Sequence, residues 1–318
     1  MRYGKKAGIK YMCTKYMNGH YYSLNQYLRE QFGCKVYKVA LSGGYTCPNR
    51  DGTLGTGGCI FCSESGSGDF AAERSLNVKD QIRTAAERIR TKTSADHCIA
   101  YFQTFTTTYA PISYIESLLS QAVSVPEVAA VSLGTRPDCL PADVLRLLER
   151  FNRIKPVWVE LGLQTIHERS AHYIRRGYPL SDYDNAVAHL HDIGINVVTH
   201  VILGLPDESV DEMLETVRYA GSVTNGIKLQ LLHILKGTDL AADYLNGKFS
   251  ALTMDEYIDI ICRCIEVLPQ EVVIHRLTGD GSKSLLIAPL WSGNKKLVLN
   301  TLNRELSRRN IVQGSNAK

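Results

Sequence analysis

The sequence predicts an α/β fold in which successive strand–helix units build a partial (β/α)6, TIM-like barrel. From position 35 onward, short runs rich in β-branched residues alternate with longer amphipathic runs, a pattern typical of βα units and a parallel sheet. Polar, glycine-containing motifs follow several strand-like runs, as loops do at the carboxyl ends of barrel strands. We therefore expect one main domain, followed by an extension from about Gly237.

Six strands are expected, at 35–42, 98–103, 128–133, 156–162, 195–203 and 227–233. The intervening stretches predict helices at about 78–93, 111–124, 141–152, 168–193 and 208–224, and Asp182 and Ser209 are suited to start helices. Residues 1–34 are expected to form a basic, aromatic arm and a helix, 35–236 the barrel with a loop at 43–70, and 237–318 the extension. That extension should hold a helix near 253–267 and a C-terminal helix.

Composition places the chain among ordinary globular proteins with a large core. Its nine cysteines are an odd and mostly scattered set, which argues against a disulfide framework and favours a reducing, cytoplasmic location. We find neither an apolar run approaching the roughly 20 residues of a membrane span nor the apolar core of a signal peptide.

Positive charge is concentrated near the two ends of the chain. The N-terminal arm carries five tyrosines and the cations Arg2, Lys5, Lys6, Lys10 and Lys15, and a C-terminal set comprises Lys295, Lys296, Arg304, Arg308 and Arg309. Such residues can contact phosphates and stack on bases, so they are candidates for nucleic-acid binding. A solvated tail and an ordinary basic helix are the alternative.

Three cysteines, Cys47, Cys59 and Cys62, lie in the glycine-rich loop CPNRDGTLGTGGCIFCSESGSGDFA. Structural zinc normally takes four ligands as two close pairs, whereas this loop has one close pair and one distant thiolate. A four-iron cluster held by three thiolates keeps one iron open for a substrate, and Phe61 could shield it from water. The spacing favours such a cluster, with a zinc knuckle that borrows a histidine, or three buried thiols, as alternatives.

The motif Cys59-Ile60-Phe61-Cys62 resembles half of the radical S-adenosylmethionine (radical SAM) signature, although eleven residues separate Cys47 from Cys59 where most of that superfamily has three. This longer gap is shared in kind by the radical SAM subunit of Elongator. The runs KVALSGGYTCPNRDG, AYFQTFTTTYAP, GTRPDCLP, VWVELGLQT, THVILGLP, LLHILKGT and HRLTGDG resemble the YtqA/YhcC family, and GSGDFA looks most like its YtqA branch. The resemblance implies a six-stranded radical SAM barrel, one [4Fe-4S] cluster on the three cysteines, and S-adenosylmethionine.

S-adenosylmethionine would need partners for its amine, carboxylate, ribose and adenine, and the strand ends offer them. Where many radical SAM enzymes have a Gly-Gly-Glu-like motif for the amine, this chain has Gln103-Thr104. The forked donors of Arg136 or Arg175 suit the carboxylate. The remaining cofactor candidates are Glu160 and Gln164 for the ribose, Gly204 for the adenine, and His200 on the fifth strand.

A second group of residues is expected to face the substrate. The sixth strand ends in Lys228, Gln230 and His233, and of these His233 is a substrate candidate; the HRLTGDG motif supplies further candidates. The candidates are Tyr101, His233, His275, Arg276, Asp280 and Lys283, with Arg276 or Lys283 suited to a substrate carboxylate. For each candidate in both groups, the alternative is a core residue satisfied by backbone or by a buried ion pair.

The resemblance also implies a substrate and partners. The substrate is expected to be tRNA that carries 5-carboxymethylaminomethyl-uridine at the wobble position, converted to aminomethyl-uridine, with a flavodoxin or ferredoxin as electron donor. A radical SAM enzyme of small metabolites or peptides, and a zinc-containing RNA-binding protein, are the alternatives.

Overall fold

The computed structural model describes residues 16–64, 66, 71, 76–90, 95–279 and 281–317. The cations of the N-terminal arm, most of the GSGDFA run and Asp280 lie outside the described residues.

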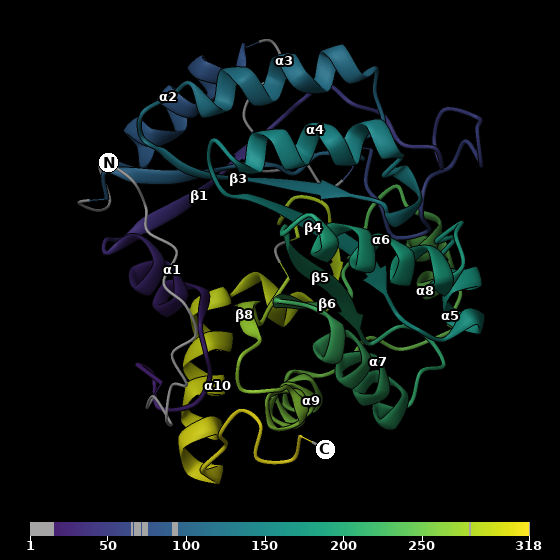
Figure 1. Cartoon of the computed structure of the whole chain (residues 1–318). Coiled ribbons are helices and arrows are strands. Elements are labelled where there is room, and N and C mark those ends of the chain that lie inside the picture. The colour runs from purple at the N-terminus through teal and green to yellow at the C-terminus, as the bar shows by residue number, and fades with distance from the viewer. Residues whose placement is uncertain are drawn as a thin grey trace.

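A curled parallel sheet forms the centre of the molecule (Figure 1). Its strand order is β1-β2-β3-β4-β5-β6-β8, and every neighbouring pair is parallel. The strands are β1 (Val36–Leu41), β2 (His97–Phe102), β3 (Val128–Thr135), β4 (Val157–Gln164), β5 (Asn196–Leu203), β6 (Gly226–Leu231) and β8 (Val273–Arg276). The partial barrel and its six expected strands are confirmed. The seventh strand, β8, was not predicted, because four residues are too few to show a strand period.

Helices cover the outer face of the curled sheet (Figure 1). Those of the barrel are α2 (Val78–Arg90), α3 (Ile112–Val123), α4 (Ala142–Asn152), α5 (Glu168–Tyr173), α6 (Leu180–Asp192) and α7 (Val210–Val223), and α1 (Leu24–Phe32) precedes β1. The single helix predicted at 168–193 is wrong, because Gly177 takes a left-handed φ of +79° and α6 starts anew after Pro179. Asp182 therefore lies inside the first turn of α6, whereas Ser209 caps α7 as predicted, in a capping box with Glu212.

The chain beyond the barrel contains α8 (Asp239–Leu245), α9 (Met254–Val267), α10 (Lys295–Arg309) and a small antiparallel pair, β7 (Ile234–Leu235) with β9 (Leu286–Ala288). The two helices expected in the extension are thus present as α9 and α10. A main apolar core includes residues of the sheet and the surrounding helices. A second apolar cluster includes Ile60, Ile174, Ile202, Leu232 and Leu240, so it holds the cysteine loop against the ends of the strands. In the described part of the chain, we find no helix with the length and apolar character of a membrane span.

Candidate active site

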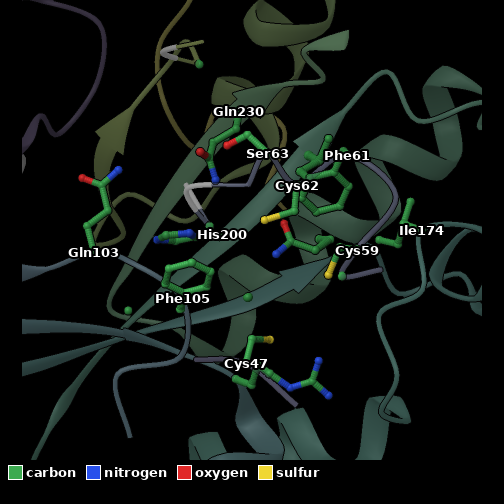
Figure 2. Close-up of a pocket in the computed structure, with 18 of the residues that line it drawn as sticks. Cys47, Cys59, Phe61, Cys62, Ser63, Gln103, Phe105, Ile174, His200 and Gln230 are labelled. Carbon is green, nitrogen blue, oxygen red and sulfur yellow. The ribbon is translucent and has the colours of Figure 1, made fainter. Parts of the chain in front are cut away.

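A cavity of about 260 Å3 lies where the carboxyl ends of the strands meet the cysteine loop. Figure 2 shows the sulfur atoms of Cys47, Cys59 and Cys62 around a common space, with Phe105 and His200 beside it. The predicted residues that line this cavity are Cys47, Cys59, Cys62, Tyr101, Gln103, Arg136, Glu160, Gln164, His200, His233 and Arg276. The fold thus brings together the cysteine loop and residues that lie in or just after β2, β3, β4, β5, β6 and β8, at the end of the barrel where sites are built.

The long gap between the first two cysteines is closed by a tight loop. The backbone N–H groups of Arg50 and Asp51 donate to the carbonyl of Cys47, and Gly58 N–H donates to Asn49 at 2.7 Å. The Arg50 guanidinium then donates to the carbonyls of Cys62 at 3.0 Å and Ser63 at 2.6 Å. Arg50 therefore links the segment that follows Cys47 to the segment that contains Cys59 and Cys62.

Gly58 is required where this loop turns back. Its φ is +74°, and a Cβ added there would lie 2.8 Å from the Nε atom of Arg50. Any other residue would combine backbone strain with a collision against the guanidinium that holds the loop together.

The cysteine environment suits a metal cluster. Asn49, which is buried, donates its side-chain amide to Cys59 Sγ at 3.4 Å and to the carbonyl of Arg175 at 2.8 Å. Such donors around the ligand sulfurs are what tunes an iron–sulfur site. Burial, with the nearby Cys62, raises the pKa of the Cys59 thiol to about 12 when no metal is bound.

No three or more His, Cys, Asp or Glu side chains among the described residues are arranged around one point as ligands of a single ion would be. A zinc site needs that convergence, with ligand atoms about 2.0–2.3 Å from one metal. The thiolates of a four-iron cluster bind separate irons, and Cys47, Cys59 and Cys62 line one cavity here, as the ligands of such a cluster would.

Gln164 offers the cavity a polar group that the protein leaves unused. The pairing of β4 with β5 is irregular between Gly162 and Gln164, and Gln164 has a left-handed φ of +69°. Its Oε1 atom is buried and has no hydrogen-bond partner in the protein. A bulge that re-aims a side chain beside a site, together with an unsatisfied acceptor, indicates that a ligand group is expected there.

The two arginines considered for the cofactor carboxylate have protein partners. Arg136 is buried, and its Nε and Nη2 atoms form a two-pronged pair with Asp138 at 2.9 and 2.7 Å. Arg175 pairs with Asp239 at 2.5 Å and does not line the cavity. Their proposed contact with S-adenosylmethionine stays a prediction.

A buried charged network forms the floor of the cavity. Glu160 is 1% exposed, and four side chains donate to its two carboxylate oxygens. Lys38 and Ser132 reach Oε1 at 2.5 and 2.6 Å, while Oε2 accepts from His200 at 2.8 Å and from Lys228. The carboxylate proposed for the ribose thus has its lone pairs occupied within the protein.

Burial and the charges of this network shift the pKa values of its members. Burial alone would raise the pKa of Glu160, but Lys228, Lys38 and His200 hold it well below its usual range. Burial lowers the pKa of Lys228 to about 7 despite the attraction of Glu160, and Lys38 and Arg276 add to the decrease. Burial and Lys228 lower the pKa of His200 to about 4, so this ring is neutral at pH 7. A lysine with a strongly lowered pKa beside a cavity is a physical criterion for a candidate functional site.

Five predicted residues are placed away from this cavity: Thr104, Arg175, Gly204, His275 and Lys283. His275 lines a separate cavity with Trp158, whose ring centroid lies 5.8 Å away, and its Nδ1 atom is buried without a partner. Successive strand residues point to opposite faces, which is why Arg276 lines the cysteine cavity and His275 does not. Lys283 is exposed to solvent.

Asn49, Arg50 and Lys38 were not singled out from the sequence. A signal for Lys38 does exist, because charged residues interrupt the apolar strands β1, β4 and β6 at Lys38, Glu160 and Lys228. Charges are rarely buried unless they are paired, so opposite charges inside neighbouring buried strands indicate an internal ion-pair network.

The comparisons with known proteins agree with this geometry. Residues 42–220 match the Radical SAM superfamily, and residues 224–308 match the Radical_SAM C-terminal domain. The chain is 45% identical to the uncharacterized protein YtqA of Bacillus subtilis over 92% of both chains. It is 37% identical to protein YhcC of Escherichia coli over 91% of this chain and 92% of that one.

More distant matches cover smaller parts of the chains compared or have lower identity. The tRNA uridine(34) acetyltransferase of Methanocaldococcus jannaschii is 25% identical over 56% of this chain and 34% of its own length. The structure of the archaeal Methanocaldococcus infernus Elp3 superposes with a TM-score of 0.66 at 17% identity, covering 87% of this chain and 64% of that one. The predicted relationship to the YtqA/YhcC family is confirmed. The chain belongs to the radical SAM superfamily, whose enzymes use a [4Fe-4S] cluster and S-adenosylmethionine.

Proposed function

We propose that this enzyme modifies the wobble uridine of tRNA, converting 5-carboxymethylaminomethyl-uridine to aminomethyl-uridine. Loss of one hydrogen atom and of one further electron, which the oxidised cluster would accept, would turn the glycine-like arm into an imine, and hydrolysis by water would release its two carbons as glyoxylate. The observation that carries this proposal is a cavity with the three cysteines on one side and the cationic residues Lys228 and Arg276 among its other lining residues. Such a cavity suits a small acidic group placed next to a radical-forming cofactor.

The cofactor would be held by residues of the cysteine loop and the strand ends. Cys47, Cys59 and Cys62 would be the cluster ligands, and the unsatisfied amide oxygen of Gln164 would meet a donor of S-adenosylmethionine. When bound, the two cofactors supply a 5′-deoxyadenosyl radical, which abstracts hydrogen from an unactivated carbon. The protein's contribution is to orient the target carbon and to exclude water from the cavity.

Two observations support tRNA as the substrate. A relative that matches 56% of this chain at 25% identity is named for its action on uridine 34 of tRNA. The N-terminal arm also has the cations and aromatic side chains that nucleic acids attract. The set on α10 contributes less, because Arg308 and Arg309 pair with Glu305, and Arg309 also pairs with Asp259. A flavodoxin or ferredoxin as electron donor stays a prediction.

The test is an anaerobic incubation of the reconstituted enzyme with S-adenosylmethionine, a reductant and tRNA that carries carboxymethylaminomethyl-uridine. We expect 5′-deoxyadenosine to increase with tRNA and to match the conversion of this nucleoside to aminomethyl-uridine, both measured by mass spectrometry. Formation of 5′-deoxyadenosine without any nucleoside change would refute the substrate.

The salt dependence of tRNA binding gives an independent test. Contacts with phosphates release counterions, so affinity for tRNA should fall steeply as salt increases. If tRNA does not bind with such a slope, an enzyme that acts on a small metabolite or a peptide becomes the better interpretation.

A further inference from the structure

The ammonium group of Lys228 has one donor more than the protein uses. Its Nζ atom lies within hydrogen-bond distance of two acceptors, a Glu160 carboxylate oxygen and the Tyr101 hydroxyl at 3.3 Å. A lysine ammonium has three N–H donors. Lys228 is 6% exposed and lines the cysteine cavity, so the third donor is available to a group bound there.

Among the described residues, the ion pairs of the cavity floor give two lysines a single carboxylate. Glu160 accepts from both Lys38 and Lys228, so one carboxylate is shared by two ammonium groups. His200 and Tyr101 add no charge at pH 7, because the pKa of the histidine is lowered and that of the phenol is raised. Arg276 lines the same cavity. Buried charge of one sign costs free energy unless an opposite charge enters with a ligand.

The two lysines that pair with Glu160 differ in their position relative to the cavity. Lys228 lines the cavity, whereas Lys38 does not and instead lies over the rings of Tyr101, at 4.7 Å, and Trp158, at 5.6 Å. Strand register sets Lys228 between His200 of β5 and Arg276 of β8, in the layer that faces the cysteines.

We propose that Lys228 binds a carboxylate of the substrate through its third N–H, with Glu160 and Tyr101 holding the ammonium in place. It replaces Lys283, which lies outside the cavity, as the lysine that recognises the acidic group. The carrier of that carboxylate, the wobble uridine arm, rests on the proposed function. The subsite itself rests on the geometry of the floor.

The proposal predicts discrimination between an acid and its neutral isostere. Two anticodon stem–loop RNAs would be compared, one with carboxymethylaminomethyl-uridine and one with its primary amide, by the rates of 5′-deoxyadenosine formation. A charge-assisted hydrogen bond corresponds to about a 10- to 100-fold preference in kcat/KM, so wild-type enzyme should prefer the acid by that factor.

Lys228→Met should abolish the preference by slowing the acid alone, and Lys228→Arg should keep part of it. The matched control is Lys38→Met, which removes the other lysine on Glu160 without removing a donor from the cavity. This control should affect the acid and the amide to the same extent. A Lys228→Met enzyme that still prefers the acid overturns the proposal.

A binding measurement decides the matter if Lys228→Met does not fold or if neither RNA is a substrate. Wild-type protein with 13C-labelled lysine would be titrated by NMR in sodium acetate and in sodium chloride of equal ionic strength, with the Lys228 signal assigned from Lys228→Arg. Acetate should raise the titration midpoint of Lys228 above its value in chloride. Equal midpoints overturn the proposal, whereas a shift with inactive RNAs supports the subsite and refutes the tRNA substrate.

Discussion

Replacing Glu160 with glutamine should destabilise the barrel more than almost any other loss of one charge. The carboxylate is 1% exposed and accepts from Lys38, Ser132, His200 and Lys228. Glutamine has one acceptor oxygen, which can keep the donors to only one of the two carboxylate oxygens. Its amide group then faces the donors of the other side, and Lys228 is left without its counter-charge.

The magnitude follows from those lost contacts. A hydrogen bond to a charged group is worth about 1.5–3 kcal/mol, so losing the two on the Oε2 side costs about 3–6 kcal/mol. Removing one member of a buried ion pair costs about 3–5 kcal/mol in other proteins, which gives the same range. We expect the free energy of unfolding to fall by about 3–5 kcal/mol at pH 7.

Urea unfolding of anaerobically prepared protein, followed by far-ultraviolet circular dichroism, measures this change. Glu149→Gln is the control, because its exposed pair with Arg153 should contribute less than about 1 kcal/mol. Adding Lys228→Met to Glu160→Gln should restore part of the lost stability, since the lysine amine that has lost its carboxylate acceptor is then gone. A loss below about 1 kcal/mol in Glu160→Gln would refute the assignment of a paired, charged carboxylate.

Three further predictions concern the cysteine loop and the floor. Cys47→Ala should lose iron and S-adenosylmethionine cleavage, measured by metal analysis and chromatography, whereas Cys98→Ala, away from the cavity, should keep both. Gly58→Ala should lose its cluster in air faster than Gly247→Ala, as followed by absorbance. Both glycines have a left-handed φ, but a Cβ at Gly58 would collide with Arg50, whereas a Cβ at Gly247 meets nothing within 4 Å. The pKa of Lys228 is about 7 in the folded protein and 10.5 in the unfolded chain, so the folded state binds this proton more weakly. The stability of the wild-type protein should therefore rise relative to Lys228→Met as pH increases from 7 to 10.5. Urea midpoints of the two proteins that run parallel across this pH range would contradict the prediction.

Local patterns in the sequence were enough to predict the barrel and to single out the three cysteines that line the cavity. Strand and helix periods depend on neighbouring residues, so six strands could be placed from the alternation of apolar runs. The spacing of Cys47, Cys59 and Cys62 likewise indicates three ligands, and the ordered motifs indicate the family. The strand β8 was too short to show a period, and the break between α5 and α6 depended on the backbone of one glycine.

The tertiary structure decided which polar residues share the cavity. Arg276 and His275 are adjacent in the sequence, yet strand pleating sends one toward the cysteines and the other to a separate cavity. Lys38, Glu160 and Lys228 are far apart in the chain, and parallel register brings them into one ion-pair network. The sequence by itself therefore determined the fold, because strand and helix periods are short-range, and the cofactors, because the ordered motifs identify the family. The charge of the pocket floor depends on contacts between distant strands and on burial, and these exist in the folded barrel alone.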